Sequence, residues 1–348
     1  MHSLLDQNCF VTIYPTDLSY IEDWATAHSD IPRNVELMSG YGRPRLKEFL
    51  LERAGYYDLV LVSRPHNMEF LSEVMAESDV LKGTKIIYDA EAIFCEREFL
   101  QMKLRGEDPS EAFIRESLEK ELSLCRNAQH ILSVSQKEAN RFRELGYDSV
   151  GVLGHVLEVK PTPKTFSERK DILFVGAIYD IESPNADSVL WFAEEIFPKI
   201  QAVLGGDVNF VVAGTNRVPE LNRRVEQLGN SNIKMLGRVD DLTRLYNNSR
   251  VFVVPTRFAA GIPHKAHEAA ARGIPMVVTD LISQQLNWTS GEQLLASAGN
   301  ADAADFANWC VSLYRDNALW DAIRAGSIDK VQHDCNSASF NESIRDAI

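Results

Sequence analysis

The sequence has few cysteines, and none of them are clustered. The number is odd, no two form a CxxC pair, and the five are Cys9, Cys95, Cys125, Cys310 and Cys335. A disulfide framework or a structural zinc site would need cysteines that are paired or closely spaced. We therefore expect reduced thiols, as in a protein of the cytoplasm.

Positive charge is also scarce. The 36 lysines and arginines are outnumbered by 50 aspartates and glutamates, which leaves a formal net charge of −14. This balance argues against a surface that binds nucleic acid or an anionic membrane, because both are polyanions. An anionic substrate would need positive charge gathered at its site. No apolar run of spanning length and no signal peptide is visible, so we predict a cytoplasmic protein without an integral membrane segment.

Several common catalytic signatures are missing as well. The sequence has no GxSxG motif, no Walker loop and no GxGxxG after a strand, which excludes serine hydrolases, P-loop NTPases and common dinucleotide-binding enzymes. No DxD pair with apolar neighbours is present to hold a nucleotide-bound divalent ion. His264 and His267 are three residues apart, but no third ligand follows at a suitable spacing. We predict no metal and no bound cofactor.

The pattern that is present alternates short apolar runs with amphipathic segments. At 348 residues the chain is long enough for two domains. Strand–helix alternation predicts βαβ units and an α/β fold with parallel sheets. We expect strands over 10–14, 35–38, 59–62, 85–88, 131–134, 151–153, 172–175, 208–213, 233–236, 251–254 and 276–278. We expect helices over 44–53, 68–76, 110–126, 136–145, 186–203, 219–228 and 242–247, followed by a helical tail over 301–348.

A polar stretch, KPTPKTFSERKD over 160–171, interrupts the alternation. Its prolines and charges are typical of a linker between domains. We therefore predict one Rossmann-like domain over 1–160, a second over 161–335, and a C-terminal helix over 336–348 that packs back on the first domain. Two such domains facing one another would hold a ligand in the cleft between them.

The clearest functional signal is a strand–loop–helix–strand segment, VFVVPTRFAAGIPHKAHEAAARGIPMVVTD over 251–280. Its Ala-rich helix is expected to begin at Pro263 and to stop at Gly273, since these residues suit the first helical position and the position past the end. His264 and Lys265 then occupy the first turn, where the helix dipole disfavours cations. Positive side chains beside free backbone N–H groups make an anion site, most simply a phosphate site.

Glu268 extends this signal, because it lies three residues after Lys265 on the same helix face. A carboxylate beside a phosphate site can accept hydrogen bonds from ribose hydroxyls. The pattern thus favours a nucleoside diphosphate as ligand. The alternative is a solvated Lys265–Glu268 pair on an ordinary helix.

Three further residues are candidates in the second domain. Gly176 follows the strand over 172–175, where a glycine lets the backbone approach a phosphate or sugar closely, although many strand–helix turns also need one. Arg257 follows the strand over 251–254 and could bind a diphosphate or form a surface salt bridge. Asn185 is more simply explained as the cap of the helix that starts near Ala186.

In the first domain, polar residues follow two neighbouring strands. Arg64 and His66 follow the strand over 59–62, and His66 could contact a sugar hydroxyl, assist proton transfer or fill a structural role. Asp89 and Glu91 follow the next strand and could bind the acceptor or act as general base. They could also serve as caps and as salt-bridge partners of Arg97.

Taken together, these motifs resemble a known family. From DILFVGAIYD at 171–180 through LGRVDDLTRLYNNSRVFVVP to the 251–280 segment, the second half resembles the nucleotide-sugar domain of family 4 glycosyltransferases, also called glycosyl transferases group 1. The first half resembles the acceptor domain of the group through DLVLVSRPH and IIYDAEAIFCERE. The likeness is greatest to bacterial members found as modules in surface-glycan assembly proteins.

The resemblance implies a GT-B fold, with two Rossmann-like domains facing a central cleft. It implies metal-independent transfer from a nucleoside diphosphate sugar to a glycan or lipid-linked acceptor, with retention of the anomeric configuration. It also implies that Lys265 contacts the diphosphate and that Glu268 holds the ribose. By the same resemblance Gly261 and Gly176 are the loop glycines, and Arg257 is a second phosphate contact.

Two departures from the family pattern are visible. The family often has a pair of glutamates separated by seven residues, the first of which faces the donor sugar. Counted back from Glu268, that position is Ala260 in this chain. The strand over 10–14 matches the family's second strand, so the first strand and its Gly-rich loop are expected to be missing or partly replaced by residues 1–8. The missing piece would come from elsewhere if the chain is a module of a larger glycosyltransferase.

Our leading hypothesis is a retaining glycosyltransferase of bacterial surface-polysaccharide synthesis. His66, Asp89 and Glu91 would serve the acceptor side, and Gly176, Arg257, Gly261, His264, Lys265 and Glu268 the donor side. A sugar-nucleotide epimerase of the same shape is an alternative within enzymes. A non-catalytic GT-B module that binds a glycan or nucleotide is the alternative outside them, and Ala260 favours it.

Overall fold

The computed structural model describes residues 1–18, 24, 28, 31–299 and 301–348. These residues form two compact units, and each is made from separate stretches of the chain. Unit 1 comprises 1–95, 110–154 and 337–348, and unit 2 comprises 96–109 and 155–336. The chain therefore passes between the units at residues 154 and 155, before the polar stretch over 160–171.

Unit 2 is built on a six-stranded parallel sheet with the strand order β12-β11-β10-β7-β8-β9. The strands are β7 (Asp171–Val175), β8 (Phe210–Ala213), β9 (Ile233–Gly237), β10 (Ser249–Val254), β11 (Met276–Thr279) and β12 (Leu295–Ser297). The chain starts in the middle at β7, moves outward to β9, and returns to β10 on the other side. This order is that of the Rossmann fold, whose ligands bind at the carboxyl ends of the strands where the order reverses. In unit 2 that point lies between β7 and β10.

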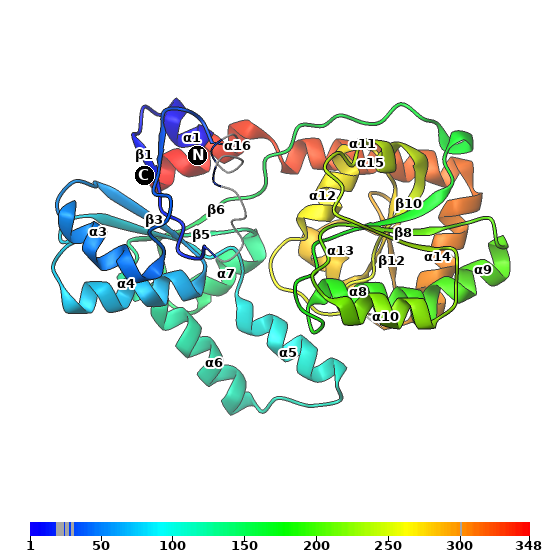
Figure 1. Cartoon of the computed structure of the whole chain (residues 1–348), viewed down its shortest axis with the longest axis horizontal. Helices are drawn as coiled ribbons and strands as arrows, with labels where there is room; N and C mark the ends of the chain where they lie inside the picture. The colour runs from blue at the N-terminus through cyan, green and yellow to red at the C-terminus, as the bar shows by residue number, and fades with distance from the viewer. Residues whose placement is uncertain (19–23, 25–27, 29–30, 300) are drawn as a thin grey trace. The chain divides into compact units, whose positions relative to one another are not determined.

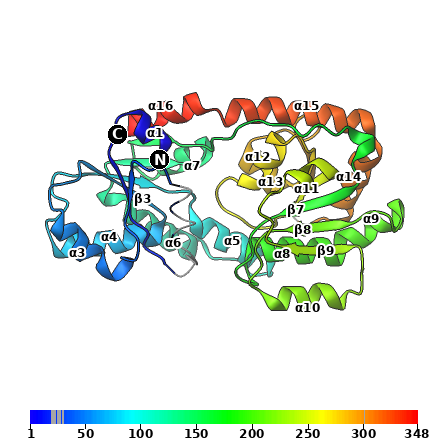
Figure 2. The same ribbon diagram turned by 45° about the horizontal axis from the view of Figure 1, so that its top comes forward.

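Helices cover both faces of this sheet (Figure 2). One face packs on α8 (Pro184–Trp191), the π-helical turn η4 (Phe192–Ile196), α9 (Phe197–Leu204), α10 (Pro219–Gln227) and α14 (Ala303–Arg315). The other packs on α11 (Thr243–Asn248), α12 (His264–Ala271) and α13 (Asp280–Leu286). Strands β7, β8, β10 and β11 are buried from both sides, which explains why they read as continuous apolar runs in the sequence, whereas the edge strand β9 alternates buried and exposed residues.

The long helix α15 (Asn317–Asp334) contributes to both cores of unit 2. Trp320 and Ile323, near its start, pack in one core, and Val331, near its end, packs in the other. A short turn, η3 (Phe166–Glu168), precedes β7 and places Phe166 against Trp320. The indole of Trp320 donates to the carbonyl of Arg250 at 2.7 Å.

Unit 1 contains a four-stranded parallel sheet with the order β3-β4-β5-β6 (Figure 1). Its strands are β3 (Leu59–Ser63), β4 (Lys85–Asp89), β5 (His130–Ser133) and β6 (Val150–Val152). Two more strands, β1 (Val11–Ile13) and β2 (Val35–Leu37), pair with each other in a separate parallel sheet. Residues 2–6 form helix α1 (His2–Asp6) and not a strand.

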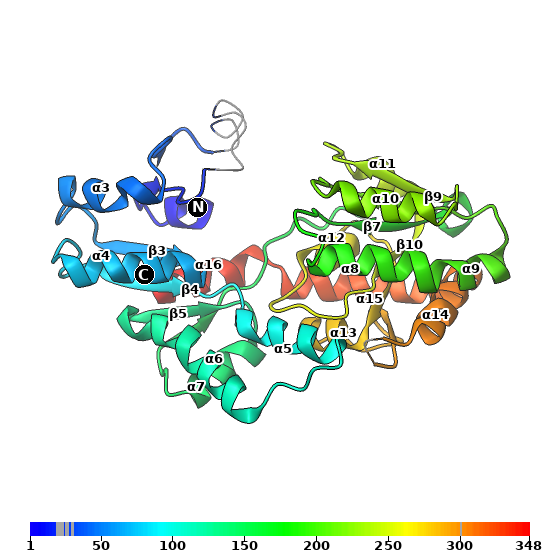
Figure 3. The same cartoon turned by 60° about the horizontal axis from the view of Figure 1, so that its bottom comes forward.

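The helices of unit 1 that follow α1 are α3 (Leu46–Glu52) with the turn η1 (Arg43–Arg45), α4 (Pro65–Glu77), α6 (Glu111–Ser123) with the turn η2 (Leu124–Asn127), α7 (Gln136–Glu144) and α16 (Ser337–Ala347). Helix α4 follows β3 and packs on it, and α7 packs on β5 and β6 (Figure 3). Helix α16 packs on α1 and β6, and its Ile344 and Ala347 share a core with Ile87 and Leu132 of the sheet.

Most elements expected from the sequence are present, with shifted ends. The expected helix over 186–203 is interrupted by the turn η4, which adopts π-helical hydrogen bonding. Strand β12, α13 and α5 (Phe94–Leu104) were not expected, because their sequences lack a long apolar run or clear end signals. The described residues include no helix that is both long and apolar enough to cross a membrane.

Candidate functional site

The loop and helix after β10 hold most of the expected donor-side residues. The helix begins at His264 and not at Pro263, which instead occupies the N-cap position with an extended backbone. Gly261 lies in the preceding loop at φ +74°, a left-handed conformation that glycine adopts without strain. After the helix, Gly273 has φ +68° and is the residue past the C-cap Arg272. The expected stop signal is therefore correct.

Lys265 points from the first turn of α12 toward the end of β7. Its Nζ lies 4.2 Å from the centre of the Phe174 ring and donates a hydrogen bond to the side-chain oxygen of Asn185. The residue as a whole is half-buried, but its ammonium group is enclosed. Burial lowers the pKa of Lys265 to about 7, and no nearby charge contributes. Within the described part of the chain, no carboxylate forms an ion pair with Lys265.

Asn185 has a different role from the one that its sequence suggests. The side chain of Ser183 caps α8 by accepting from the Ala186 N–H, so the expectation that Asn185 is the cap is wrong. Asn185 lies within the first turn of α8, donates from Nδ2 to the carbonyl of Ala177 at 2.7 Å, and accepts from Lys265. Sequence reasoning missed this contact because the two residues are 80 positions apart.

Gly176 lies where these side chains converge. A Cβ atom at this position would stand 3.0 Å from Asn185 Nδ2 and 3.0 Å from Lys265 Nζ. Gly214, after β8, has φ +136°, and a Cβ there would stand 2.2 Å from the carbonyl oxygen of Gly176. The two glycines therefore let the turns after β7 and β8 approach each other at the ligand-binding edge of the sheet.

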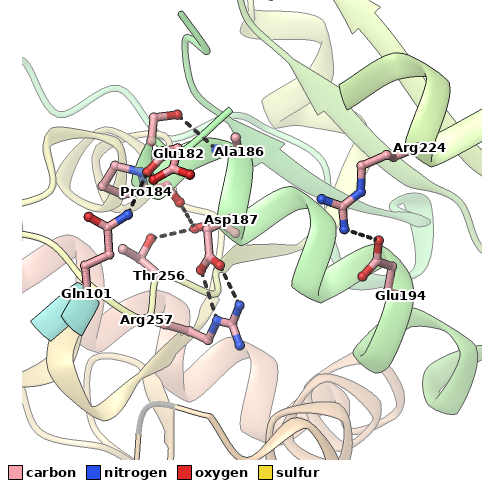
Figure 4. A network of polar contacts seen from close by, with 11 residues as sticks. Gln101, Glu182, Pro184, Ala186, Asp187, Glu194, Arg224, Thr256 and Arg257 are labelled. Atoms are coloured by element: carbon pink, nitrogen blue, oxygen red, sulfur yellow. Dashed lines mark hydrogen bonds and ion pairs between the residues drawn. The ribbon is translucent and has the colours of Figure 1, made fainter. Parts of the chain in front are cut away.

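Arg257 is engaged in an ion pair with Asp187 of α8 (Figure 4). Its Nε donates to Oδ2 at 3.0 Å and its Nη2 to Oδ1 at 2.5 Å, while the guanidinium lies 5.1 Å from the Trp191 ring centre. Both side chains are about four-fifths buried. Of the two expected roles for Arg257, the salt bridge is present, although it is not on the surface. Its charge is balanced by Asp187, unlike that of Lys265.

Glu268 lies one turn after Lys265 on α12 and is half-buried. Its carboxylate is near Tyr246 of α11, and burial, followed by this carboxylate, raises the pKa of the Tyr246 hydroxyl. Thus Lys265 faces the end of β7, and Glu268 faces α11 on the same side of the sheet. Ala260, without a carboxylate, lies in the loop before α12.

His264 lies at the exposed start of α12 beside two other histidines. Its ring centre is 4.9 Å from that of His155, whose Nδ1 lies 3.0 Å from Nδ1 of His267. Cys335 Sγ lies 3.3 Å from the same Nδ1 of His267. Burial lowers the pKa of His155 to about 4 and that of His267 to about 3, so both rings are neutral at pH 7. No group of three or more side chains with metal-binding geometry occurs among the described residues.

In unit 1, the three acceptor-side candidates lie at the carboxyl ends of β3 and β4. Asp89 accepts from Ser63 Oγ at 2.8 Å, and burial raises the pKa of its carboxyl group. Glu91 pairs with Arg64 at 2.8 Å. His66 is exposed as a residue, but its ring is partly buried. This partial burial, followed by the nearby positive charges of Arg43 and Arg64, lowers the pKa of the ring.

Arg64 and Glu91 also share an unusual backbone conformation. Their φ angles are +76° and +50°, which side-chain-bearing residues rarely adopt. Such conformations are found more often at functional sites than elsewhere. The Arg64–Glu91 ion pair joins these two residues across the ends of β3 and β4.

Residues 169–316 match the family model described as glycosyl transferases group 1. No curated protein matches the chain significantly.

Solved structures resemble nearly the whole chain at low sequence identity. Sucrose-phosphate synthase from Thermosynechococcus elongatus is 16% identical with a TM-score of 0.71, and the match covers 99% of this chain and 89% of that one. HepE from Anabaena, in complex with UDP and glucose, is 16% identical with a TM-score of 0.68 over 93% of this chain and 88% of that one. S. aureus TarM, in complex with UDP, Fondaparinux and alpha-GlcNAc-glycerol, is 10% identical with a TM-score of 0.68 over 86% of this chain and 57% of that one. These likenesses show the α/β fold with two Rossmann-like units that the sequence predicts.

Proposed function

We propose that the protein is a glycosyltransferase that moves a sugar from a nucleoside diphosphate sugar to a glycan or lipid-linked acceptor. The observation that carries the proposal is the ammonium of Lys265, which has no carboxylate partner among the described residues and lies at the carboxyl end of β7. It lies where the strand order of unit 2 reverses, within the part that matches glycosyl transferases group 1. We propose transfer with retention and without a metal ion, as a step of surface-polysaccharide synthesis in the cytoplasm.

The proposed reaction depends on positive charge at the carboxyl edge of the unit 2 sheet. The departing diphosphate gains negative charge as the glycosidic bond breaks, and the ammonium of Lys265 and the N–H groups of α12 would stabilise it. The sugar would pass through an oxocarbenium-like state, as in glycoside hydrolysis. Glu268 would hold the ribose. In unit 1, the lowered pKa of His66 favours its neutral imidazole, which could accept a proton from an acceptor hydroxyl, and Asp89 at the end of β4 is the second candidate for this role.

We further propose a uridine nucleotide as donor, since HepE and TarM were solved with UDP. The first test is calorimetric titration of UDP into the full chain and into Lys265→Met. Loss of the ammonium should weaken UDP binding by about 10- to 100-fold, the range for a hydrogen bond to a charged group. Lys199→Ala, which removes an exposed lysine of α9 in the same unit, is the matched control. Equal affinity in the wild type and Lys265→Met would overturn the phosphate assignment.

The second test is turnover with a panel of UDP sugars and glycan acceptors, with chelator added and omitted. Formation of product with unchanged anomeric configuration, in the presence of chelator, is the expected result. Release of nucleotide with an altered sugar and no modified acceptor would instead indicate an epimerase.

A non-catalytic binding module is the second candidate. Ala260 favours it, because this residue of the loop before α12 has no carboxylate that could contact a sugar. UDP binding without turnover across the whole panel would support this candidate over the transferase.

A further inference from the structure

Helix α8 presents two polar side chains to two cations of unit 2. Asn185 accepts a hydrogen bond from Lys265, and Asp187, two residues later, accepts two from Arg257. Both cations are largely enclosed and both lie after a central strand of the sheet. They differ in the charge of the partner, which is a neutral amide for the lysine and a carboxylate for the arginine.

This difference decides which cation can attract an anion. A carboxylate at hydrogen-bond distance cancels most of the field of its partner. An amide oxygen fixes the position of the ammonium through its dipole but leaves the full positive charge in place. Arg257 and Asp187 together therefore carry little net charge, whereas Lys265 keeps its positive charge and is held in a fixed position by Asn185.

Asn185 is itself held firmly. Its Nδ2 donates to the carbonyl of Ala177 at 2.7 Å, so its oxygen faces Lys265. Gly176 leaves room for both side chains, since a Cβ there would approach each within 3.0 Å. The turn after β7 thus fixes the amide, and the amide fixes the ammonium.

We propose that Asn185 is a positioning residue that holds Lys265 at the carboxyl end of β7 without neutralising it, so that the site is ready for the diphosphate of a nucleotide sugar. The inference rests on the proposed function in its choice of ligand. The contact between the neutral Asn185 amide and the charged Lys265 ammonium exists in the free protein, so it can be tested without a ligand.

A dependence on pH follows, because burial lowers the pKa of Lys265 to about 7. The groups that face it are Phe174 from β7 and Asn185 from α8, while Asp187 is paired with Arg257, and His264 and Glu268 are on its own helix. A bound diphosphate would raise the pKa of the ammonium. Binding then takes up a proton above pH 7, so affinity should fall as the pH rises, by up to about tenfold per unit. The terminal phosphate ionises near pH 6, below this window.

The deciding variant is Asn185→Asp, which keeps the size of the side chain and places a carboxylate beside Lys265. Two effects are expected in calorimetric titrations of UDP into the full chain between pH 6.5 and 9. Affinity at pH 7 should fall about tenfold or more, because the charge is cancelled. The decline of affinity with pH should move to higher pH or vanish, because the new carboxylate keeps the lysine protonated.

Two companion variants separate this effect from a structural one. Asn185→Ala loses both hydrogen bonds of the amide, so it should bind more weakly but keep the wild-type pH profile. Asn317→Asp makes the same change of net charge at the exposed start of α15 and should match the wild type throughout. A wild-type pH profile in Asn185→Asp would overturn the inference, since a merely structural asparagine changes affinity without moving the titration.

The same question can be settled in the free protein by an NMR titration of the Lys265 Cε signal, assigned by its absence in Lys265→Met. The lysine should titrate near pH 7 in the wild type and at least one unit higher in Asn185→Asp. An unchanged titration would overturn the inference. If UDP fails to bind the wild type while this shift is observed, the proposed function fails and the assigned charge arrangement stands.

Discussion

Arg257, in the loop after β10, forms a bidentate ion pair with Asp187 of helix α8. Its Nε lies 3.0 Å from Oδ2 and its Nη2 lies 2.5 Å from Oδ1. Replacing Asp187 with alanine would leave the enclosed guanidinium without a partner. We expect the free energy of unfolding of Asp187→Ala to fall by about 1.5–3 kcal/mol, the range for hydrogen bonds to charged groups. Urea denaturation of the full chain measures this change.

The control for this prediction is a second pair nearby, Glu194 with Arg224 at 3.0 Å (Figure 4). It is far more exposed than the first, at 35% and 44% of the side-chain surfaces. Glu194→Ala should therefore lower the free energy of unfolding by less than about 1 kcal/mol, as for other exposed pairs. Equal losses in the two variants would contradict the importance of burial here.

Two glycines should respond differently to the addition of one methyl group. In Gly214→Ala the new carbon would meet a backbone oxygen at 2.2 Å, at a φ of +136°, so we expect a loss of about 1–3 kcal/mol in the free energy of unfolding. In Gly176→Ala it would meet the ends of the Asn185 and Lys265 side chains at 3.0 Å and not a backbone atom, so nucleotide affinity should fall more than stability does. Gly206→Ala, with open space around the new carbon, is the control. Calorimetry and urea denaturation together distinguish the outcomes.

Acid should destabilise unit 2 through its buried histidines. The pKa values of His155 and His267 are lowered to about 4 and about 3, whereas unfolded histidines titrate near 6.5. Between these values the unfolded chain binds more protons, so the free energy of unfolding falls as the pH drops below about 6.5, by up to about 1.4 kcal/mol per unit for each histidine. Urea denaturation between pH 7.5 and 4.5 measures the slope.

The double variant His155→Asn, His267→Gln tests the origin of this slope. It should show a flatter dependence on pH, because the groups that resist protonation are gone. His333→Asn changes an exposed histidine near the end of α15 and should keep the wild-type slope. The same slope in the double variant as in the wild type would rule these two histidines out as its cause.

His66 and Asp89, at the carboxyl ends of β3 and β4, should contribute to sugar transfer but not to nucleotide binding. We expect His66→Ala and Asp89→Asn to lower kcat/KM by about 100-fold, the lower end of the range for a proton-transfer group. UDP affinity should stay within about twofold of the wild type. Glu69→Gln, an exposed change on the same helix as His66, should leave both quantities unchanged. Full activity in both site variants would remove these residues from the mechanism.

The sequence predicts β7, β8, β10 and β11 of unit 2 well because these strands are buried on both faces and so form apolar runs. Short β12 has only three residues, and α5 follows a polar turn, so neither stood out. Local spacing also placed Lys265 and Glu268 on one helix. The cap of α8 is a local feature that the sequence could have shown, since Ser183 precedes Pro184 at the first helical position. Local spacing could not show that Arg257 meets Asp187, 70 positions away, or that Asn185 faces Lys265, 80 positions away. Such contacts arise only when distant loops meet at the edge of the folded sheet.

The assembly of unit 1 from separate stretches of chain has a consequence for how the protein folds during synthesis. Its core includes Ile87 and Leu132 from the sheet, and Ile344 and Ala347 from α16. A ribosome must therefore finish all of unit 2 before the last side chains of the unit 1 core exist. While unit 2 is translated, the face of the unit 1 sheet that α16 later covers stays exposed. Unit 2 can complete its cores first, and α16 then seals unit 1 as the final step.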